Sequence, residues 1–183
     1  METAEMLARK IWITRKARIR ASERLARRDE YSKLMLAYYS FASLAFSVIE
    51  LKLRRLPTNF PLYDVLLGIL LFGAAIYVNT LNFASRSDAL KQCYLSLDQL
   101  YVELCKAPDG SQLIESISQR YNEILQGSEN HSEYDYISVM VDNSPAELSR
   151  RQRRAYTFYR ALMRLLVVFA TAFPVVLGVW VLK

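Results

Sequence analysis

The residues best suited to chemistry lie in one short segment, Glu129–Val139, which holds the only histidine of the chain. A metal site or an acid–base site usually needs a second histidine, or a cysteine at ligand spacing, and neither lies nearby. We therefore expect no catalytic site, no metal and no cofactor. Two interpretations stay open for the segment: a capping and hydrogen-bonding cluster, or a pocket for a ligand or signal. The residues concerned are Asn130, His131, Asp135 and Tyr136.

A nucleotide bound near this segment would need cations, because phosphates are held by charge-assisted hydrogen bonds. The region from Arg86 to Glu147 has eleven acidic residues and only four basic ones. The candidates are Arg86, Lys91, Arg120 and the run 150–154. Of these, we assign Arg86 and Arg120 to the candidate ligand site. A cyclic nucleotide or a related nucleotide is the expected ligand class.

The two cysteines, Cys93 and Cys105, are twelve positions apart in a segment predicted to be one helix. At 1.5 Å per residue they are about 18 Å apart, too far for a disulfide. We interpret them as small hydrophobic residues in a reducing compartment.

The elements that position these residues follow from how charge is distributed along the chain. Apolar residues make up 52% of the 183 residues and the net charge is +6, with the charges gathered in blocks. Blocks of this kind favour a membrane protein over a soluble domain. About twenty apolar residues span the bilayer, and the sequence predicts three spans, at 34–53, 63–83 and 160–183, with an extracytoplasmic loop at 54–62. The alternative is two spans and a C-terminal helix lying on the membrane surface.

The remaining segments are predicted to be helical, so the fold class is an all-α membrane protein: a transmembrane hairpin, a third span and a small cytoplasmic helical region. Apolar periodicity predicts helices at 85–106 and 111–126 within the region 84–159. Ten cations precede the first span and four lie at 150–154, which predicts a cytoplasmic N-terminus by the positive-inside rule. We expect a multi-pass protein of the bacterial inner membrane.

Residues 1–33 are predicted to form a basic amphipathic helix that leads into the first span. Membrane-surface contact is the default interpretation, because cations near anionic lipid are attracted to it. No base-reading motif accompanies the charge, so we expect no nucleic-acid partner. Arg15 and Arg18 intrude on the apolar side of this helix. Because the region 84–159 is acidic, an open alternative is that the two polar parts dock on each other. The membrane-contact residues are Arg9, Lys16, Arg20, Arg24, Arg27 and Arg28.

Polar and small residues form stripes on the first two predicted spans. A charged residue facing lipid is costly, so these stripes should face protein or water. They either pack helices tightly, with Asn79 as an interhelical hydrogen bonder, or line a water-filled path in an oligomer. The second span carries Asp64, Gly68, Ala75, Asn79 and Asn82, and the first carries Ser40, Ser43, Ser47 and Glu50.

Part of this pattern resembles a known family. The chain resembles the SLATT domain over roughly residues 9–165. Three groups of residues carry the resemblance: Thr14, Arg15, Lys16, Arg18, Ala21, Arg24 and Leu25; Tyr38, Tyr39 and Ser40; and Asn130, His131, Asp135 and Tyr136. The name denotes the SMODS and SLOG-associating two-transmembrane effectors of bacterial conflict systems. The third span departs from the two-span description.

The resemblance implies an antiphage effector of abortive infection that acts beside a nucleotide second-messenger synthase or sensor protein. Such an effector is expected to assemble as a homo-oligomer in the lipid bilayer and to damage the membrane of an infected cell. The alternative hypothesis is a constitutive oligomeric membrane scaffold or channel subunit whose cytoplasmic helices bind a protein partner.

Overall fold

The computed structural model describes residues 4–52, 60–106 and 112–181, and within these ranges the chain is helical and has no strand. Three of its helical stretches, Ala4–Ile49, Pro61–Lys106 and Arg150–Val179, are long and apolar enough to cross a membrane. The predicted all-α class with three candidate spans is therefore confirmed. The elements are α1 (Ala4–Lys52), α2 (Phe60–Thr80), α3 (Phe83–Lys106), α4 (Gln112–Gln126), α5 (Glu133–Asn143), the short 3₁₀ helix η1 (Pro145–Glu147) and α6 (Arg150–Val181).

The chain divides into two compact units. We call Met1–Arg27 with Phe83–Phe158 the polar unit, and Arg28–Asn82 with Tyr159–Lys183 the membrane unit. The polar unit contains the first part of α1, α3, α4, α5, η1 and the start of α6. The membrane unit contains the rest of α1, α2 and the rest of α6.

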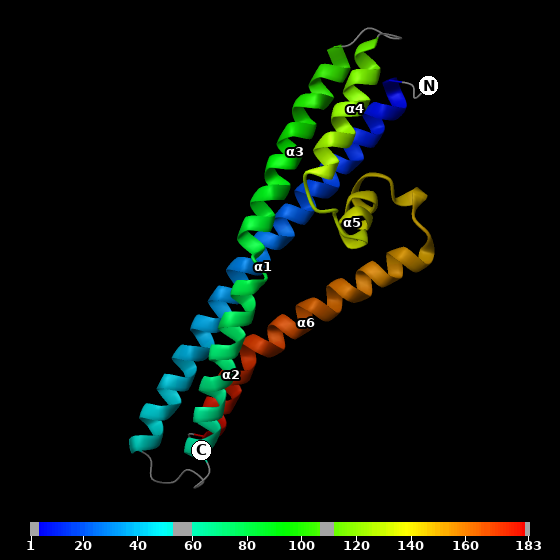
Figure 1. Ribbon diagram of the computed structural model, residues 1–183. Coiled ribbons are helices and arrows are strands. Elements are labelled where there is room, and N and C mark those ends of the chain that lie inside the picture. Colours follow the sequence, from blue (N-terminus) through cyan, green and yellow to red (C-terminus); the bar gives the residue numbers. More distant parts are fainter. Residues whose placement is uncertain (1–3, 53–59, 107–111, 182–183) are drawn as a thin grey trace. The chain divides into compact units, whose positions relative to one another are not determined.

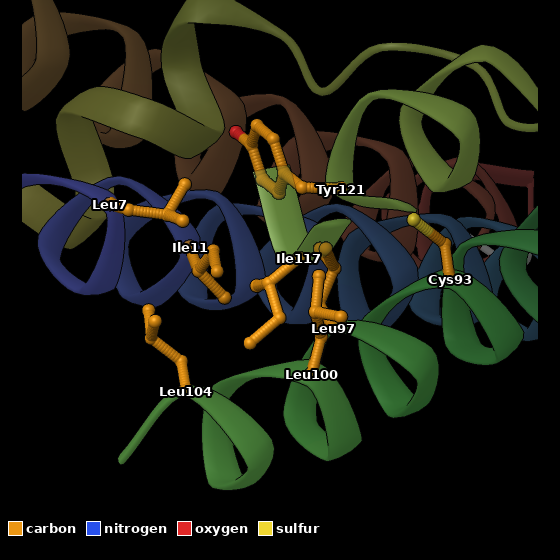
Figure 2. Close-up of a cluster of buried hydrophobic side chains, with 8 residues drawn as sticks. All are labelled: Leu7, Ile11, Cys93, Leu97, Leu100, Leu104, Ile117 and Tyr121. Carbon is orange, nitrogen blue, oxygen red and sulfur yellow. The ribbon is translucent and has the colours of Figure 1, made fainter. Parts of the chain in front are cut away.

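In the polar unit, α1 lies beside α3 and α4 (Figure 1) and shares one apolar core with them. Their apolar positions recur every three to four residues, so each helix presents one stripe to the others. Figure 2 shows the side chains of this core, and each fully buried leucine or isoleucine contributes about 1.5–3 kcal/mol. The members are Leu7 and Ile11 of α1, Cys93, Leu97, Leu100 and Leu104 of α3, and Ile117 and Tyr121 of α4.

Reciprocal hydrogen bonds join α1 to α3 at two small residues, Ser22 and Ser87. Ser22 Oγ donates to the Ser87 carbonyl at 3.0 Å, and Ser87 Oγ donates to the Ser22 carbonyl at 2.9 Å. Both serines are buried, and a second small core of Ala21, Leu25 and Leu90 lies next to them in the sequence. The basic N-terminal segment therefore directs its apolar side at protein.

The helix α5 begins at a capping box. Ser132 is the N-cap, its hydroxyl accepts from the Asp135 amide, and the Asp135 carboxylate accepts from the Ser132 amide at 3.0 Å. Two donors of the helix start are thereby satisfied. Of the two interpretations left open for this segment, a capping cluster or a ligand pocket, Asp135 has the hydrogen bonds of the first.

The second span and the helix after it are separated by a break. α2 ends at Thr80 and α3 begins at Phe83, whereas the second span was predicted to continue to residue 83. Asn82 has a φ of 48°, the left-handed conformation that asparagine tolerates and that commonly ends a helix. Asn82 therefore lies outside the α2 helix, and the predicted stripe of the second span stops at Asn79.

In the membrane unit, α1 contacts α6 where Pro174 interrupts the hydrogen bonding of α6. Proline has no amide hydrogen, so the carbonyl four residues earlier, that of Ala170, loses its helical donor. The Tyr39 hydroxyl of α1 donates to this carbonyl at 2.8 Å, and the Tyr38 hydroxyl donates to the Thr171 carbonyl at 2.9 Å. A neighbouring helix thus satisfies the carbonyl that the proline frees, as membrane helices require.

Candidate functional site

The candidate site in the polar unit is built around Arg18, whose side chain is fully buried. One guanidinium nitrogen donates to Ser128 Oγ at 2.6 Å and to the Glu129 carbonyl, and the other donates to Asn130 Oδ1 at 3.4 Å. A planar fork of donors suits three acceptors spread over three consecutive residues. Arg18 therefore fixes the segment between α4 and α5 against α1.

Six residues further along α1, about 1.7 turns, Arg24 holds the start of α5. Its Nε and Nη2 atoms each donate to one carboxylate oxygen of Asp135 at 2.8 Å. Asp135 is 1% exposed and Arg24 is 22% exposed, so this ion pair is largely shielded from water. Burial raises the pKa of Asp135, but the hydrogen bonds from Arg24 and Ser132 outweigh burial and leave that pKa below its ordinary value. The carboxylate is charged at neutral pH.

In the sequence, His131 lies between Asn130, which Arg18 binds, and Asp135, which Arg24 binds. Its side chain is half-buried. Among the described residues no hydrogen-bond partner reaches its Nδ1 atom, which is shielded from solvent. Burial lowers the pKa of His131, and the Arg18 charge lowers it further, against an opposing effect of Asp135. The imidazole is therefore neutral at physiological pH.

The two arginines proposed to bind a ligand lie at different places. Arg86 of α3 donates to Glu129 at 2.9 Å, which brings it to the Arg18-bound segment beside Asn130 and His131. Arg120 of α4 instead pairs with Glu103 of α3 at 2.5 Å. The structure therefore gathers Arg86, Asn130, His131 and Asp135, with the half-buried Tyr136 one position on, and leaves Arg120 apart from them.

Several cations predicted to contact the membrane surface have partners within the protein. Arg9 pairs with Glu147 at 2.6 Å, Arg20 with Asp142 at 2.7 Å, and Arg24 with Asp135. Lys16 lies over the Trp12 ring at 5.8 Å, and Arg27 donates to the Glu23 carbonyl at 3.2 Å. Docking of the basic helix on the acidic helices, the open alternative of the sequence analysis, is thus seen within one chain. Arg28 belongs to the membrane unit, where it donates to the Tyr159 hydroxyl at 3.4 Å.

The predicted stripes of the membrane unit meet at one carboxylate. Ser43 Oγ of α1 donates to Asp64 Oδ1 of α2 at 2.6 Å, and Ser47 donates to the other oxygen. The remaining stripe residues of α2, namely Gly68, Ala75 and Asn79, are exposed, and a Cβ built on Gly68 would meet no atom within 4 Å. Ser40 is exposed as well, and the side chain of Glu50 lies outside the described residues.

Comparison with known proteins now bears on this arrangement. Residues 1–182 match the SMODS and SLOG-associating 2TM effector domain, family 5. The chain belongs to the SLATT family. No curated protein and no solved structure matches it.

The family match of this SLATT protein covers residues 1–182, a longer range than the 9–165 of the sequence resemblance. The match therefore includes the third apolar helix, α6. The family is named for its association with SMODS and SLOG domains and for two transmembrane helices, so this SLATT protein is a membrane protein of the effector class.

Sequence reasoning did not select Arg18 or Arg15 as site residues of the SLATT chain, although both intruded on the apolar side of the basic helix. That intrusion was the available signal, because a cation on a buried face needs polar partners. Arg15 is bound to Asp98 and lies over the Tyr101 ring at 5.2 Å. Arg15 therefore links α1 to α3, and Arg18 links α1 to the segment between α4 and α5.

Proposed function

We propose that this SLATT protein is an antiphage effector that assembles into a homo-oligomer and permeabilises the bacterial inner membrane when it is triggered. The observation that carries the proposal is the exposure of α2. None of the residues in its most apolar stretch is buried within the chain. Apart from the contact of Asp64 with two serines of α1, one chain thus leaves most of this helix uncovered, so lipid, water or other copies must surround it.

The polar residues of α2 favour other copies of the chain and water, rather than lipid alone, as neighbours of this helix. An asparagine or aspartate that faced lipid alone would be costly. Asp64 is satisfied by two serines of α1, whereas the exposed Asn79, Gly68 and Ala75 face away from the rest of the chain. In an oligomer these residues line a water-filled path between copies. A single chain has too few helices to enclose one.

The orientation we propose places the N-terminus and the polar unit in the cytoplasm. Cations favour the cytoplasmic side, and ten of them precede the first span. A reporter fused after Lys106 should then report a cytoplasmic position, and one fused after Lys183 a periplasmic position. A cytoplasmic signal at both points would mean that α6 does not cross the membrane.

The trigger we propose is a nucleotide second messenger or an associated sensor protein, which the SMODS association of the family supports. For a nucleotide, the phosphates would compete with Glu129 for Arg86 beside Asn130. Losing one charge-assisted hydrogen bond of about 1.5–3 kcal/mol should weaken binding tenfold or more, so Arg86→Gln tests the site. Calorimetry of the intact protein in detergent with cyclic dinucleotides and trinucleotides measures this. Absence of binding would favour a protein-borne signal.

Permeabilisation is tested in cells that express the chain inducibly with a membrane-potential dye. Asn79→Leu and Ser43→Leu should keep the oligomer, measured by crosslinking in membranes, and abolish depolarisation. Ile76→Leu is the matched control, because Ile76 is an exposed apolar residue of the same helix and should depolarise cells as the wild type does. If both polar variants assemble and depolarise cells at the wild-type rate, these stripes do not form the conduction path.

A further inference from the structure

The membrane unit contains two exposed arginines of α6, Arg160 and Arg164. From Arg150 to Val181 the helix carries six arginines, and no acidic residue occurs in the sequence after Glu147. Two of the six, Arg160 and Arg164, belong to the membrane unit and are exposed. Within the described ranges no carboxylate reaches either of them.

The neighbouring part of α1 does not carry the same charge. Between Arg28 and Lys33 there are two cations and two acids, so their charges cancel. Lys33 is paired with Asp29 at 2.7 Å, and Glu30 is exposed. The contact of Arg28 with the Tyr159 hydroxyl brings this segment to the helix turn that holds Arg160. The net charge of this end of the membrane unit is therefore +2, and it comes from α6.

The distance along α6 places the two arginines at the membrane surface. From Arg164 to Val181 the helix rises about 26 Å, close to the hydrocarbon thickness of about 30 Å. Arg164 then lies where the span meets the headgroups, and Arg160 lies one turn, about 6 Å, further out on the same face. An arginine at this depth extends its guanidinium toward the headgroups.

We propose that Arg160 and Arg164 form a binding site for an anionic phospholipid headgroup, such as that of phosphatidylglycerol. Two guanidinium groups four residues apart can each donate to phosphate oxygens of one lipid. The cations of α1 that were first assigned this role are mostly bound to protein groups, whereas the arginines of α6 have an open side. The site is separate from the stripe that includes Asn79 and does not depend on permeabilisation.

Binding of fluorescent phosphatidylglycerol to the intact protein in neutral detergent tests the site. Each cation at an anionic surface strengthens binding about fivefold, so Arg160→Gln with Arg164→Gln should weaken binding roughly 25-fold. Replacing both arginines by lysine should keep most of the affinity, because the charge is retained. The matched control is Lys91→Gln with Arg120→Gln, which removes the same charge from exposed residues of the polar unit and should change affinity less than twofold.

Competition identifies the chemistry of the ligand. Unlabelled phosphatidylglycerol should displace the probe, and phosphatidylcholine should not. Equal displacement by phosphatidylcholine would overturn the proposal, as would an equal loss of affinity in the control variant. Displacement by millimolar inorganic phosphate would identify a general anion site and would also overturn it. Helix content measured by circular dichroism confirms that each variant is folded.

Discussion

Arg24 of α1 and Asp135 of α5 are joined by two parallel hydrogen bonds of 2.8 Å, and the same carboxylate closes the capping box of Ser132. One buried charge thus serves both the start of α5 and its attachment to α1. Two more ion pairs attach α5 and η1 to α1, one from Arg20 to Asp142 and one from Arg9 to Glu147. Both of these pairs are exposed. Exposed pairs contribute at most about 1 kcal/mol, so Arg24 is the main electrostatic anchor of α5.

Arg24→Gln should therefore lower the free energy of opening α5 by about 3 kcal/mol, because it leaves a buried carboxylate without its partner. Hydrogen exchange of the α5 amides in the intact protein measures the opening. Arg27→Gln removes an exposed arginine of the same helix and should change the opening by less than about 0.5 kcal/mol. Similar exchange in both variants would show that the pair does not anchor α5.

Arg18→Lys should loosen the segment from Ser128 to Asn130 even though the charge is kept. One ammonium group cannot reach the three acceptors that the guanidinium fork reaches, and we expect a loss of about 2 kcal/mol. Cleavage after Glu129 by a glutamate-specific protease reports the loosening. In the control Arg20→Lys, whose arginine is exposed, cleavage at this bond should match the wild type. An unchanged rate for Arg18→Lys would contradict the role given to Arg18.

Acidification should destabilise the polar unit through His131. Because its pKa is lowered in the folded chain, the unfolded chain binds more protons in the window below about pH 6.5. The stability is therefore complete above that pH and falls as pH falls toward the folded pKa. Melting temperatures of the intact protein at pH 7.5, 6.5 and 5.5 should decrease for the wild type and change less for His131→Gln. An equal decrease in both would assign the effect to other groups.

Tyr39→Phe should weaken the contact of α1 with α6 by about 1 kcal/mol, in the range known for interhelical hydrogen bonds in membranes. The loss should vanish when Pro174→Ala is added, because the new amide of residue 174 can then donate to the Ala170 carbonyl. Unfolding in mixed detergent micelles measures both variants. Tyr77→Phe, an exposed tyrosine of α2, is the control and should have no effect. Equal losses with and without the proline would contradict the proposed role of the Tyr39 hydroxyl.

The sequence by itself determined the helical class and the three candidate spans. Uninterrupted apolar runs of about twenty residues are local features, and a helix satisfies its backbone hydrogen bonds within one segment. The helices at 85–106 and 111–126 were predicted within two residues of their observed bounds for the same reason, since the period of apolar residues is a property of one helix. For Asp135 the sequence left a capping cluster and a ligand pocket both open, and the capping box that Asp135 forms with Ser132 was visible only in the structure.

Only the tertiary structure decided what each face covers. The basic side of α1 was suited to lipid or to acidic helices, and the choice depended on residues such as Asp135, 111 positions from Arg24. Periodicity identifies a face but not its partner, because contacts over such separations leave no local pattern. The break at Asn82 likewise depended on a left-handed backbone conformation at one residue inside an otherwise helical pattern. The burial of Arg18 was decided in the same way, by acceptors that only the folded chain brings together.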